Sequence, residues 1–236
     1  MKKLFSIITI VKNAENLVQD TILSVLGQSC KDFEYTIIDG DSEDNTIGVV
    51  RDFEYGIKNI ISENDKGIYY AMNRGRDISK GDYILYMNAG DTFANINVLE
   101  NIKAEILKLD KSPDVIYGDV ILKSGVILKN QKAKELKYIF KGMCFCHQSV
   151  FVKNELICFD THYKLAADYN LFFKLYKNNH TFHYLPIPIS IYDANGLSNS
   201  LTALVEQFKV NLLNSFSFRA IIHYLPRIIY NYIKNA

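Results

Sequence analysis

The first part of the chain alternates short apolar runs with segments whose apolar residues recur every three or four positions. The runs are rich in β-branched and aromatic residues and predict buried β-strands, whereas residues 16–26 and 68–78 have the spacing of helices. Strands that alternate with helices indicate a parallel sheet with right-handed crossovers. The four predicted strands are residues 4–11, 33–38, 58–62 and 82–87.

The rest of the chain has a looser pattern of the same kind. Residues 98–109 and 166–176 predict helices, and a hairpin is expected around Gly125. No linker separates two autonomous units, so we expect one α/β domain over residues 1–200 and a helical appendage over residues 201–236. Further strands are predicted at residues 114–119, 181–185 and 189–192.

Composition narrows the class of protein. The chain has 27 Lys and Arg against 26 Asp and Glu, a net charge of +1, so no global field attracts nucleic acid. Its four cysteines lack the paired spacing of a metal site, which favours reduced thiols in a cytosolic protein. The sequence has neither a signal peptide nor an apolar run of ~18 residues. We therefore expect a cytoplasmic protein, soluble or peripheral on the inner face of the cell membrane.

Acidic side chains follow three of the predicted strands at the point where each strand ends. Asp39 and Asp41 follow the second strand, Asp65 the third and Asp91 the fourth. Loops at the carboxyl ends of neighbouring parallel strands converge on one crevice. Carboxylates there can accept hydrogen bonds from a base or ribose and can ligate Mg²⁺ or Mn²⁺ on a diphosphate. An Asx turn or a helix cap is the structural alternative for Asp39 and Asp41.

Six segments in a fixed order carry a resemblance to a known family. They are Ser6–Asn13, Ile37–Thr46, Asp65–Asn73, Met87–Asp91, His147–Ser149 and Ala166–Tyr169. Over about residues 4–200 the chain resembles a family 2 glycosyltransferase of the kind that assembles bacterial surface polysaccharides. The resemblance implies the GT-A nucleotide-diphospho-sugar transferase fold, an α/β fold with a mixed, mainly parallel sheet flanked by helices, here with a C-terminal helical tail. It implies a nucleotide-binding half over about residues 1–91 and an acceptor-side half over about residues 92–200.

The resemblance assigns the donor side of the site to residues at the strand ends. Thr9 and Asp39 would hold the nucleobase, most often uracil in this family, and Asp41 would reach the ribose or cap the turn. Asp65 belongs to the second acidic turn, after the third strand, and Lys66 beside it is the nearest cation to the expected diphosphate. A solvated surface lysine is the alternative for Lys66.

The segment from Asn88 to Asp91 takes the place of the family's Asp-x-Asp metal motif. Asn88 stands where the first Asp is usual, and Gly90 replaces an acidic neighbour. The resemblance therefore implies Asp91 as the single protein carboxylate on Mn²⁺ or Mg²⁺, with Asn88 as a neutral ligand. Such ions commonly keep waters and take few protein ligands beside substrate phosphates.

Asp168, at the predicted start of a helix, resembles the family's catalytic base. An inverting transfer needs a carboxylate that removes the proton from the acceptor hydroxyl as it attacks the anomeric carbon. The structural alternative is an N-terminal helix Asp that favours the macrodipole. His147, which we expect at the start of a strand, would face the sugar and acceptor side of the cleft, and a buried structural histidine is its alternative.

Together these features predict an inverting hexosyltransferase for surface polysaccharide synthesis. Its donor would be a UDP-hexose or UDP-N-acetylhexosamine, and its acceptor a saccharide or an undecaprenyl-linked saccharide. One alternative is a nucleotidyltransferase that makes nucleotide sugars, although residues 9–15 lack the Gly-rich loop expected for a triphosphate. The other alternative is a non-catalytic scaffold that binds sugar nucleotides.

The tail has its own pattern. Residues 215–236 are rich in apolar and aromatic side chains, contain basic residues and have no acidic residue. A helix of this kind can lie in a membrane interface. Its alternative is packing on the catalytic domain or on a second subunit of a homodimer. Pro226 is expected to kink or divide the helix.

Overall fold

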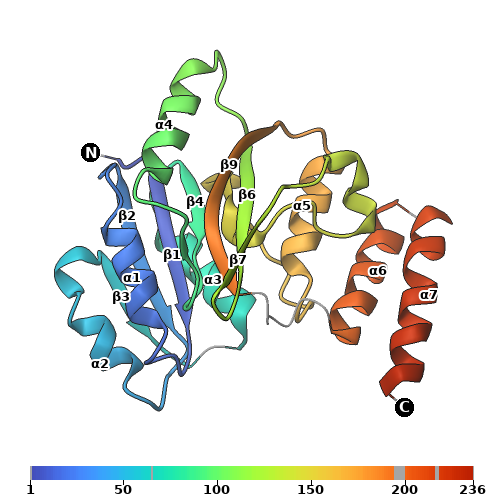
Figure 1. Cartoon of the computed structure of the whole chain (residues 1–236), viewed down its shortest axis with the longest axis horizontal. Helices are drawn as coiled ribbons and strands as arrows, with labels where there is room; N and C mark the ends of the chain where they lie inside the picture. The colour runs from blue at the N-terminus through green and yellow to red at the C-terminus, as the bar shows by residue number, and fades with distance from the viewer. Residues whose placement is uncertain (1, 65, 194–199, 216–217, 236) are drawn as a thin grey trace.

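The computed structural model describes residues 2–64, 66–193, 200–215 and 218–235 (Figure 1). Within these residues the chain forms one mixed sheet of nine strands in the order β3-β2-β1-β4-β8-β6-β9-β5, with β7 paired to β6. The strands are β1 Phe5–Val11, β2 Phe33–Asp39, β3 Asn59–Ser62, β4 Tyr83–Tyr86, β5 Thr92–Phe93, β6 Val115–Ser124, β7 Ile127–Gln131, β8 Val150–Lys153 and β9 Phe182–Asp193.

The first four strands are parallel, as predicted. β1 lies between β2 and β4, and β3 pairs with the outer side of β2. In this register Val11 is opposite Asp39, and Asp39 is opposite Ser62. The carboxyl ends of these strands therefore lie together at one edge of the sheet, the lower edge in Figure 1, and the N-terminus lies near the opposite edge.

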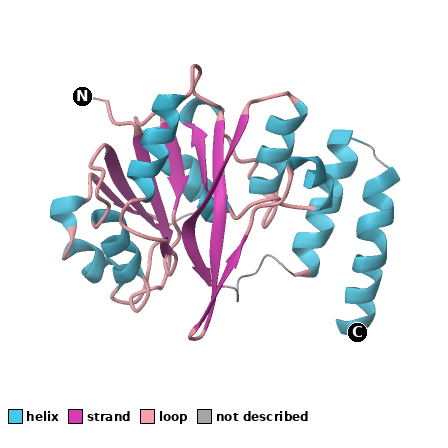
Figure 2. Cartoon of the chain, turned by 45° about the horizontal axis from the view of Figure 1, so that its top comes forward, coloured by secondary structure: helices cyan, strands magenta, loops and turns pink. Residues whose placement is uncertain are grey.

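Helices cover both faces of the sheet (Figure 2). Alternate residues of β1 point to opposite sides: Ile8 belongs to a core with Met72 and Phe172 of α3 and α5, whereas Ile7 belongs to a core with Ile22 of α1 and with residues of α2 and α4. The α-helices are α1 Val18–Leu26, α2 Thr46–Arg51, α3 Ile68–Ile78, α4 Val98–Lys108, α5 Ala167–Lys177, α6 Leu201–Ser215 and α7 Phe218–Asn235. The 3₁₀ helices are η1 Glu54–Gly56, η2 Leu136–Lys141, η3 His147–Ser149 and η4 Asn154–Leu156.

The second half of the sheet mixes strand directions. β8 runs antiparallel to β4 and β6, and β9 runs parallel to β6. The two strands expected at residues 181–185 and 189–192 are one strand, β9, and this part of the prediction is wrong. The pairing of β6 with β9 shifts register around Gly118, which accommodates the prolines of β9. A Cβ on Gly118 would lie 2.7 Å from the carbonyl oxygen of Ile187, so only glycine fits there.

The tail forms two helices at one end of the molecule. α7 packs on α6 through Ala220 and Tyr224, which contact Leu204. α7 continues on both sides of Pro226, so the expected division of the helix does not occur. Pro226 is exposed, where water can replace the lost backbone hydrogen bond. No helix within the described part of the chain has the length and apolar character needed to cross a bilayer.

Candidate active site

Asp39 ends β2 at the carboxyl edge and is fully buried. Its carboxylate accepts hydrogen bonds from the Ser62 hydroxyl at 2.6 Å and from the Ser42 backbone N–H at 3.0 Å, and it also contacts the Ser42 hydroxyl. Thr9 is fully buried as well, and its hydroxyl lies 2.7 Å from the Met87 carbonyl oxygen and 2.9 Å from the Tyr35 hydroxyl. The polar atoms of both predicted base-binding residues are thus engaged within the protein, and their contact with a nucleobase stays a prediction.

The loop after β2 carries the remaining predicted polar residues. Asp41 is exposed and has a left-handed backbone with φ of 63°. Asp44 accepts hydrogen bonds from the backbone N–H groups of Thr46 at 3.0 Å and Glu15 at 3.2 Å. The hydrogen bond from the Thr46 hydroxyl lowers the pKa of Asp44 below its ordinary value. Of the two residues with an Asx turn or cap as their structural alternative, Asp39 accepts a turn hydrogen bond from the Ser42 N–H, whereas Asp41 is exposed.

Lys66 is exposed and precedes α3, whereas Asp65 lies outside the described residues. Gly67, with φ of 120°, turns the chain into the helix. Lys66 lines a shallow groove of about 350 Å³ between the end of β3 and the outer face of α3. Tyr70, Asn73 and Arg74 of α3 also line this groove.

The predicted metal motif forms a tight turn after β4. Its closing hydrogen bond runs from the Asp91 N–H to the Asn88 carbonyl oxygen at 3.0 Å, and Gly90 has φ of 96°. Thr21 of α1 holds the turn: its hydroxyl donates to the Asp91 carbonyl oxygen at 2.8 Å and accepts from the Gly90 N–H at 2.9 Å. Helix α1 therefore fixes the backbone that presents Asp91.

The side chains of this turn fit a hard cation with shared ligands. The buried Oδ1 of Asn88 accepts no hydrogen bond from the protein, and the carboxylate of Asp91 is only slightly exposed. No group of three His, Cys, Asp or Glu side chains capable of holding a metal occurs among the described residues. The two oxygen donors therefore suit an ion such as Mg²⁺ or Mn²⁺ that takes its other ligands from a diphosphate and water.

Asp168 lies in the first turn of α5, and a hydrogen bond joins it to Tyr69 of α3. Its Oδ1 accepts hydrogen bonds from the Tyr69 hydroxyl at 3.1 Å and from the Tyr169 N–H at 2.8 Å. Tyr69 is 8% exposed and packs on the ring of Phe159 at 5.6 Å. Burial, together with the charge of Asp168, raises the pKa of Tyr69 well above its ordinary value, so the phenol stays protonated and donates.

Tyr69 is the site residue that sequence reasoning did not assign. Its place in the first turn of a helix suits core packing or contact with a donor, and neither predicts contact with Asp168. The available signal is that it follows Gly67 and Ile68 at a helix start, within a motif that carries the family resemblance. Nothing in the sequence pairs that helix with the one that holds Asp168.

The buried thiol of Cys146 is within electrostatic range of both predicted carboxylates. Burial raises the pKa of this thiol to about 12, and the charges of both Asp91 and Asp168 act in the same direction. His147 begins η3 immediately before β8, and its ring packs between Tyr86 at 5.6 Å and Phe159 at 5.9 Å.

The environment of His147 also determines its charge. Burial lowers the pKa of His147, although the charge of Asp168 opposes this shift, so the imidazole is neutral at pH 7. The residue occupies an aromatic cluster, as the structural alternative supposed, and it also lies beside Asp168. Its contact with an acceptor stays a prediction.

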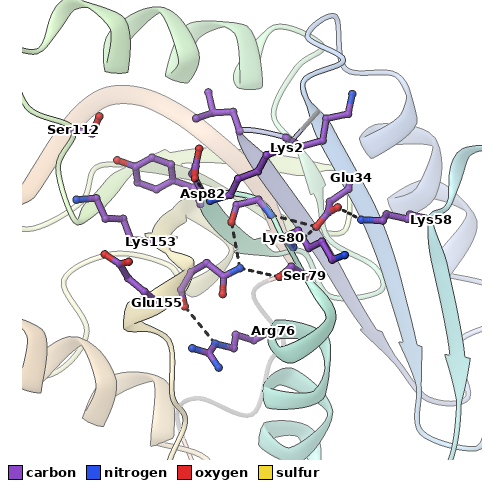
Figure 3. Close-up of a pocket in the computed structure, with 15 residues that line it drawn as sticks. Lys2, Glu34, Lys58, Arg76, Ser79, Lys80, Asp82, Ser112, Lys153 and Glu155 are labelled. Atoms are coloured by element: carbon purple, nitrogen blue, oxygen red, sulfur yellow. Dashed lines mark hydrogen bonds and ion pairs between the residues drawn. The ribbon is translucent and has the colours of Figure 1, made fainter.

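A large cavity lies at the opposite, amino edge of the sheet (Figure 3). It has a volume of about 1030 Å³ and a lining rich in lysine. Three of its lysines form ion pairs: Lys2 with Asp82, Lys58 with Glu34, and Lys153 with Asp114 outside the lining. This cavity contains none of the predicted site residues.

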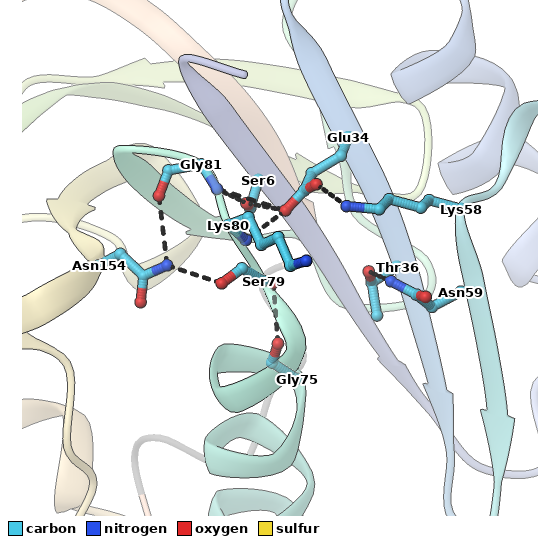
Figure 4. A network of polar contacts seen from close by, with 10 residues as sticks. All are labelled: Ser6, Glu34, Thr36, Lys58, Asn59, Gly75, Ser79, Lys80, Gly81 and Asn154. Atoms are coloured by element: carbon cyan, nitrogen blue, oxygen red, sulfur yellow. Dashed lines mark hydrogen bonds and ion pairs between the residues drawn. The ribbon is translucent and has the colours of Figure 1, made fainter. Parts of the chain in front are cut away.

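Glu34 organises that edge (Figure 4). Its carboxylate accepts a hydrogen bond from the Ser6 hydroxyl at 2.8 Å, and it also binds the Lys58 ammonium and the backbone N–H groups of Lys80 and Gly81. These donors tie the starts of β1, β2 and β4 together, so the network is a structural joint.

Comparisons with known proteins agree with this geometry. The family model described as glycosyl transferase family 2 matches residues 6–173. A PGL/p-HBAD biosynthesis glycosyltransferase of Mycobacterium bovis is 30% identical over 207 residues, covering 84% of this chain and 80% of the relative. The amylovoran biosynthesis glycosyltransferase AmsB of Erwinia amylovora is 28% identical over 208 residues, covering 80% of this chain and 69% of that protein.

Solved structures share the fold. S. aureus TarS in complex with UDP-GlcNAc has a TM-score of 0.72 at 18% identity, covering 97% of this chain and 72% of that chain. The mannosyltransferase PcManGT from Pyrobaculum calidifontis, in complex with GDP-Man and Mn²⁺, has a TM-score of 0.68 at 14% identity, covering 97% and 70%. These likenesses confirm the predicted GT-A fold. The chain belongs to glycosyl transferase family 2 and is a glycosyltransferase.

Proposed function

We propose that the protein transfers a sugar, with inversion, from a UDP-hexose or UDP-N-acetylhexosamine to a saccharide acceptor in surface polysaccharide or glycolipid assembly. The observation that carries this proposal is the 3.1 Å hydrogen bond from Tyr69, in the donor half, to Asp168, in the acceptor-side half, which joins the two halves at the candidate base. The proposed acceptor is a saccharide that is free or linked to a polyprenyl lipid such as undecaprenyl. The names of the mycobacterial and Erwinia relatives support a glycosyltransferase that acts in a biosynthetic pathway.

In this proposal Asp168 is the general base. Both of its hydrogen bonds described above go to Oδ1, so we assign Oδ2 to the acceptor proton. The acceptor oxygen attacks the anomeric carbon, the bond from that carbon to the diphosphate breaks, and the proton moves to Asp168. Tyr69 fixes the carboxylate during this transfer and does not itself take the proton.

The donor half, about residues 1–91, would bind the nucleoside diphosphate. Asp91 and Asn88 would hold a divalent cation, which when bound neutralises charge on the departing diphosphate. Asp39, Asp41 and Lys66 are the candidates for contact with the nucleoside and the diphosphate, together with Asp65 outside the described residues. Because the Thr9 hydroxyl is used internally, its proposed part is to support the strand ends around the base.

The test of the donor site is isothermal titration with UDP, with and without Mn²⁺, on the wild type and on Asp91→Ala. Asp82→Ala is the matched control, because Asp82 is a carboxylate of the amino edge. Metal-dependent binding that is lost only in Asp91→Ala would support the proposal. Binding of GDP or dTDP in place of UDP would change the donor, and no nucleotide binding at all would overturn the assignment.

A turnover assay separates this proposal from its rivals. A glycosyltransferase consumes UDP-sugar in the presence of an acceptor, a nucleotidyltransferase consumes UTP and a sugar phosphate, and a scaffold consumes neither. We expect UDP-sugar turnover that disappears in Asp168→Asn while donor binding persists.

A further inference from the structure

Helix α6 packs directly on α5, the helix that carries Asp168. Figures 1 and 2 both show α6 between α5 and α7. Val210 of α6 is fully buried in the same core as Tyr169 and Phe173 of α5. This part of the appendage is therefore continuous with the region of the domain that holds the candidate base.

The start of α5 has no cap from its own sequence. The N-cap position is Ala166, whose side chain cannot accept a hydrogen bond, whereas Ser, Thr, Asp or Asn is usual there. Residues 160–165, which lead into the helix, have no regular secondary structure and are half-buried or exposed. Core packing of α5 therefore does not by itself fix the chain that enters its first turn, where Asp168 lies.

A carboxylate of α6 supplies the missing acceptor. Glu206 Oε2 accepts hydrogen bonds from the backbone N–H groups of Leu165 at 2.8 Å and Ala166 at 3.0 Å. The backbone nitrogen of Lys164 lies 3.0 Å from Oε1 and 3.1 Å from Oε2. Three consecutive donors thus converge on one carboxylate that lies 40 positions after Ala166 in the chain. Hydrogen bonds to a charged acceptor are stronger than those between neutral groups, and a negative charge suits the N-terminal end of a helix.

Two amide side chains of α6 bind α5 on the other side of Asp168. The Asn211 side chain is fully buried and donates to the Tyr169 hydroxyl at 2.6 Å. The Asn214 side chain donates to Oδ1 of Asn170 at 3.3 Å. Helix α6 is therefore hydrogen-bonded to the chain both before and after the candidate base.

We propose that Glu206 is a positioning residue for sugar transfer, which holds the chain entering α5 so that Asp168 meets the acceptor hydroxyl. This inference rests on the proposed role of Asp168 as the general base. Tyr69 binds the carboxylate itself, whereas Glu206 fixes the backbone that precedes it. A general base must lie within hydrogen-bond reach of the proton it removes, and a misplacement of about 1 Å can lower a rate about 10²-fold. Helix α6 is thereby part of the catalytic unit.

The test is the steady-state kinetics of the full chain, measured as UDP release in the turnover assay described above. Glu206→Ala should lower kcat about ten- to hundredfold and leave KM for the donor unchanged. Glu206→Gln keeps one oxygen acceptor and should lower kcat only roughly threefold. The matched control is Lys209→Ala, which changes an exposed side chain of the same helix and should keep the wild-type kcat.

A double-mutant cycle separates positioning from a general loss of stability. In the Asp168→Asn background, Glu206→Ala should lower the residual kcat by less than about twofold, because the group that Glu206 positions is already absent. A purely structural role would lower the urea midpoint and leave kcat of the folded enzyme unchanged, as expected for Glu34→Gln at the amino edge. If Glu206→Ala does not fold, Glu206→Gln takes its place in the cycle.

Hydrogen exchange tests the same contact without an acceptor substrate. Measured by mass spectrometry, exchange over residues 160–170 should be faster in Glu206→Ala than in the wild type, because three backbone N–H groups lose their acceptor. Exchange in α3 should stay unchanged. Unchanged exchange over residues 160–170 would contradict the proposed hold on this segment.

The kinetic outcomes distinguish this inference from the proposed function. Wild-type kcat in Glu206→Ala, beside a loss in Asp168→Asn, would overturn the inference and leave the proposed function intact. Equal losses from Glu206→Ala in both backgrounds would also overturn it, since Glu206 would then act through another group. Retained turnover in Asp168→Asn would overturn the proposed function, and the role of Glu206 with it.

Discussion

The two edges of the sheet use their polar groups in opposite ways. At the amino edge, Glu34 is surrounded by donors from Ser6, Lys58, Lys80 and Gly81. At the carboxyl edge, the buried Oδ1 of Asn88 has no protein partner. The larger cavity lies at the amino edge, yet the residues of the proposed chemistry lie at the other.

This difference separates a structural joint from a candidate site. A buried polar group is costly unless it is hydrogen-bonded, so the donors around Glu34 hold several elements of the amino edge together. An unpartnered buried oxygen is a reason to look for a ligand that completes it. Whether the buried polar atoms have hydrogen-bond partners is therefore a better guide to a ligand site than the size of a cavity.

We expect the largest difference between the two edges when the proposed base is removed. Asp168→Asn should lower kcat by about 10²–10⁴-fold because the acceptor hydroxyl loses its proton acceptor. Steady-state kinetics with a UDP-sugar donor would measure this, and Asp82→Asn at the amino edge is the control. Equal losses in both variants would remove the distinction between the edges.

Replacement of the turn carboxylate should have the next largest effect. Asp91→Asn keeps the shape of the side chain but removes its charge, and we expect a loss of about 10²-fold in kcat/KM together with a weaker response to Mn²⁺. A Mn²⁺ titration of activity measures both quantities. An unchanged Mn²⁺ response would show that another group holds the ion.

At the amino edge, a change from carboxylate to amide should lower the stability of the protein without lowering kcat. Glu34→Gln should lower the free energy of unfolding by about 1–3 kcal/mol, because Lys58 and two backbone N–H groups lose a charged acceptor. Urea denaturation measures this, and kcat of the folded enzyme should stay at the wild-type value. Glu155→Gln, an exposed carboxylate of the same cavity, should change stability by less than about 0.5 kcal/mol.

A smaller effect is expected for the residue that holds the base. Tyr69→Phe removes the 3.1 Å hydrogen bond to Asp168 but keeps the ring against Phe159. We expect kcat to fall roughly fivefold, equivalent to about 1 kcal/mol, with KM unchanged. A change in KM alone would indicate that Tyr69 contacts the donor instead.

The smallest effect concerns the pH dependence of stability. Burial opposes the charge of Glu34, but hydrogen bonds from Lys58, Lys80 and Ser6 outweigh it and bring the pKa of Glu34 below its ordinary value of 4.5. A carboxylate with a lowered pKa stabilises the fold above 4.5, and this contribution is lost as the pH falls through the lowered pKa. Acid unfolding should therefore be less steep in Glu34→Gln. Equal acid slopes would contradict this assignment.

The sequence determined most of the framework and the positions of the candidate chemistry. Apolar periodicity located the first four strands and helix α3, whose predicted and observed bounds both are Ile68–Ile78. It did so because periodicity records which side of a single element is buried. The turns that carry Asp39 and Asp91 followed from the strand ends.

The tertiary structure decided what those residues contact. The fold buried Thr9, joined Tyr69 to Asp168, and placed Thr21 of α1 against the turn that carries Asp91. It also merged two predicted strands into β9 and left α7 continuous through Pro226. A local pattern states that a face is covered but not which distant element covers it, because register and pairing depend on contacts between segments far apart in the chain.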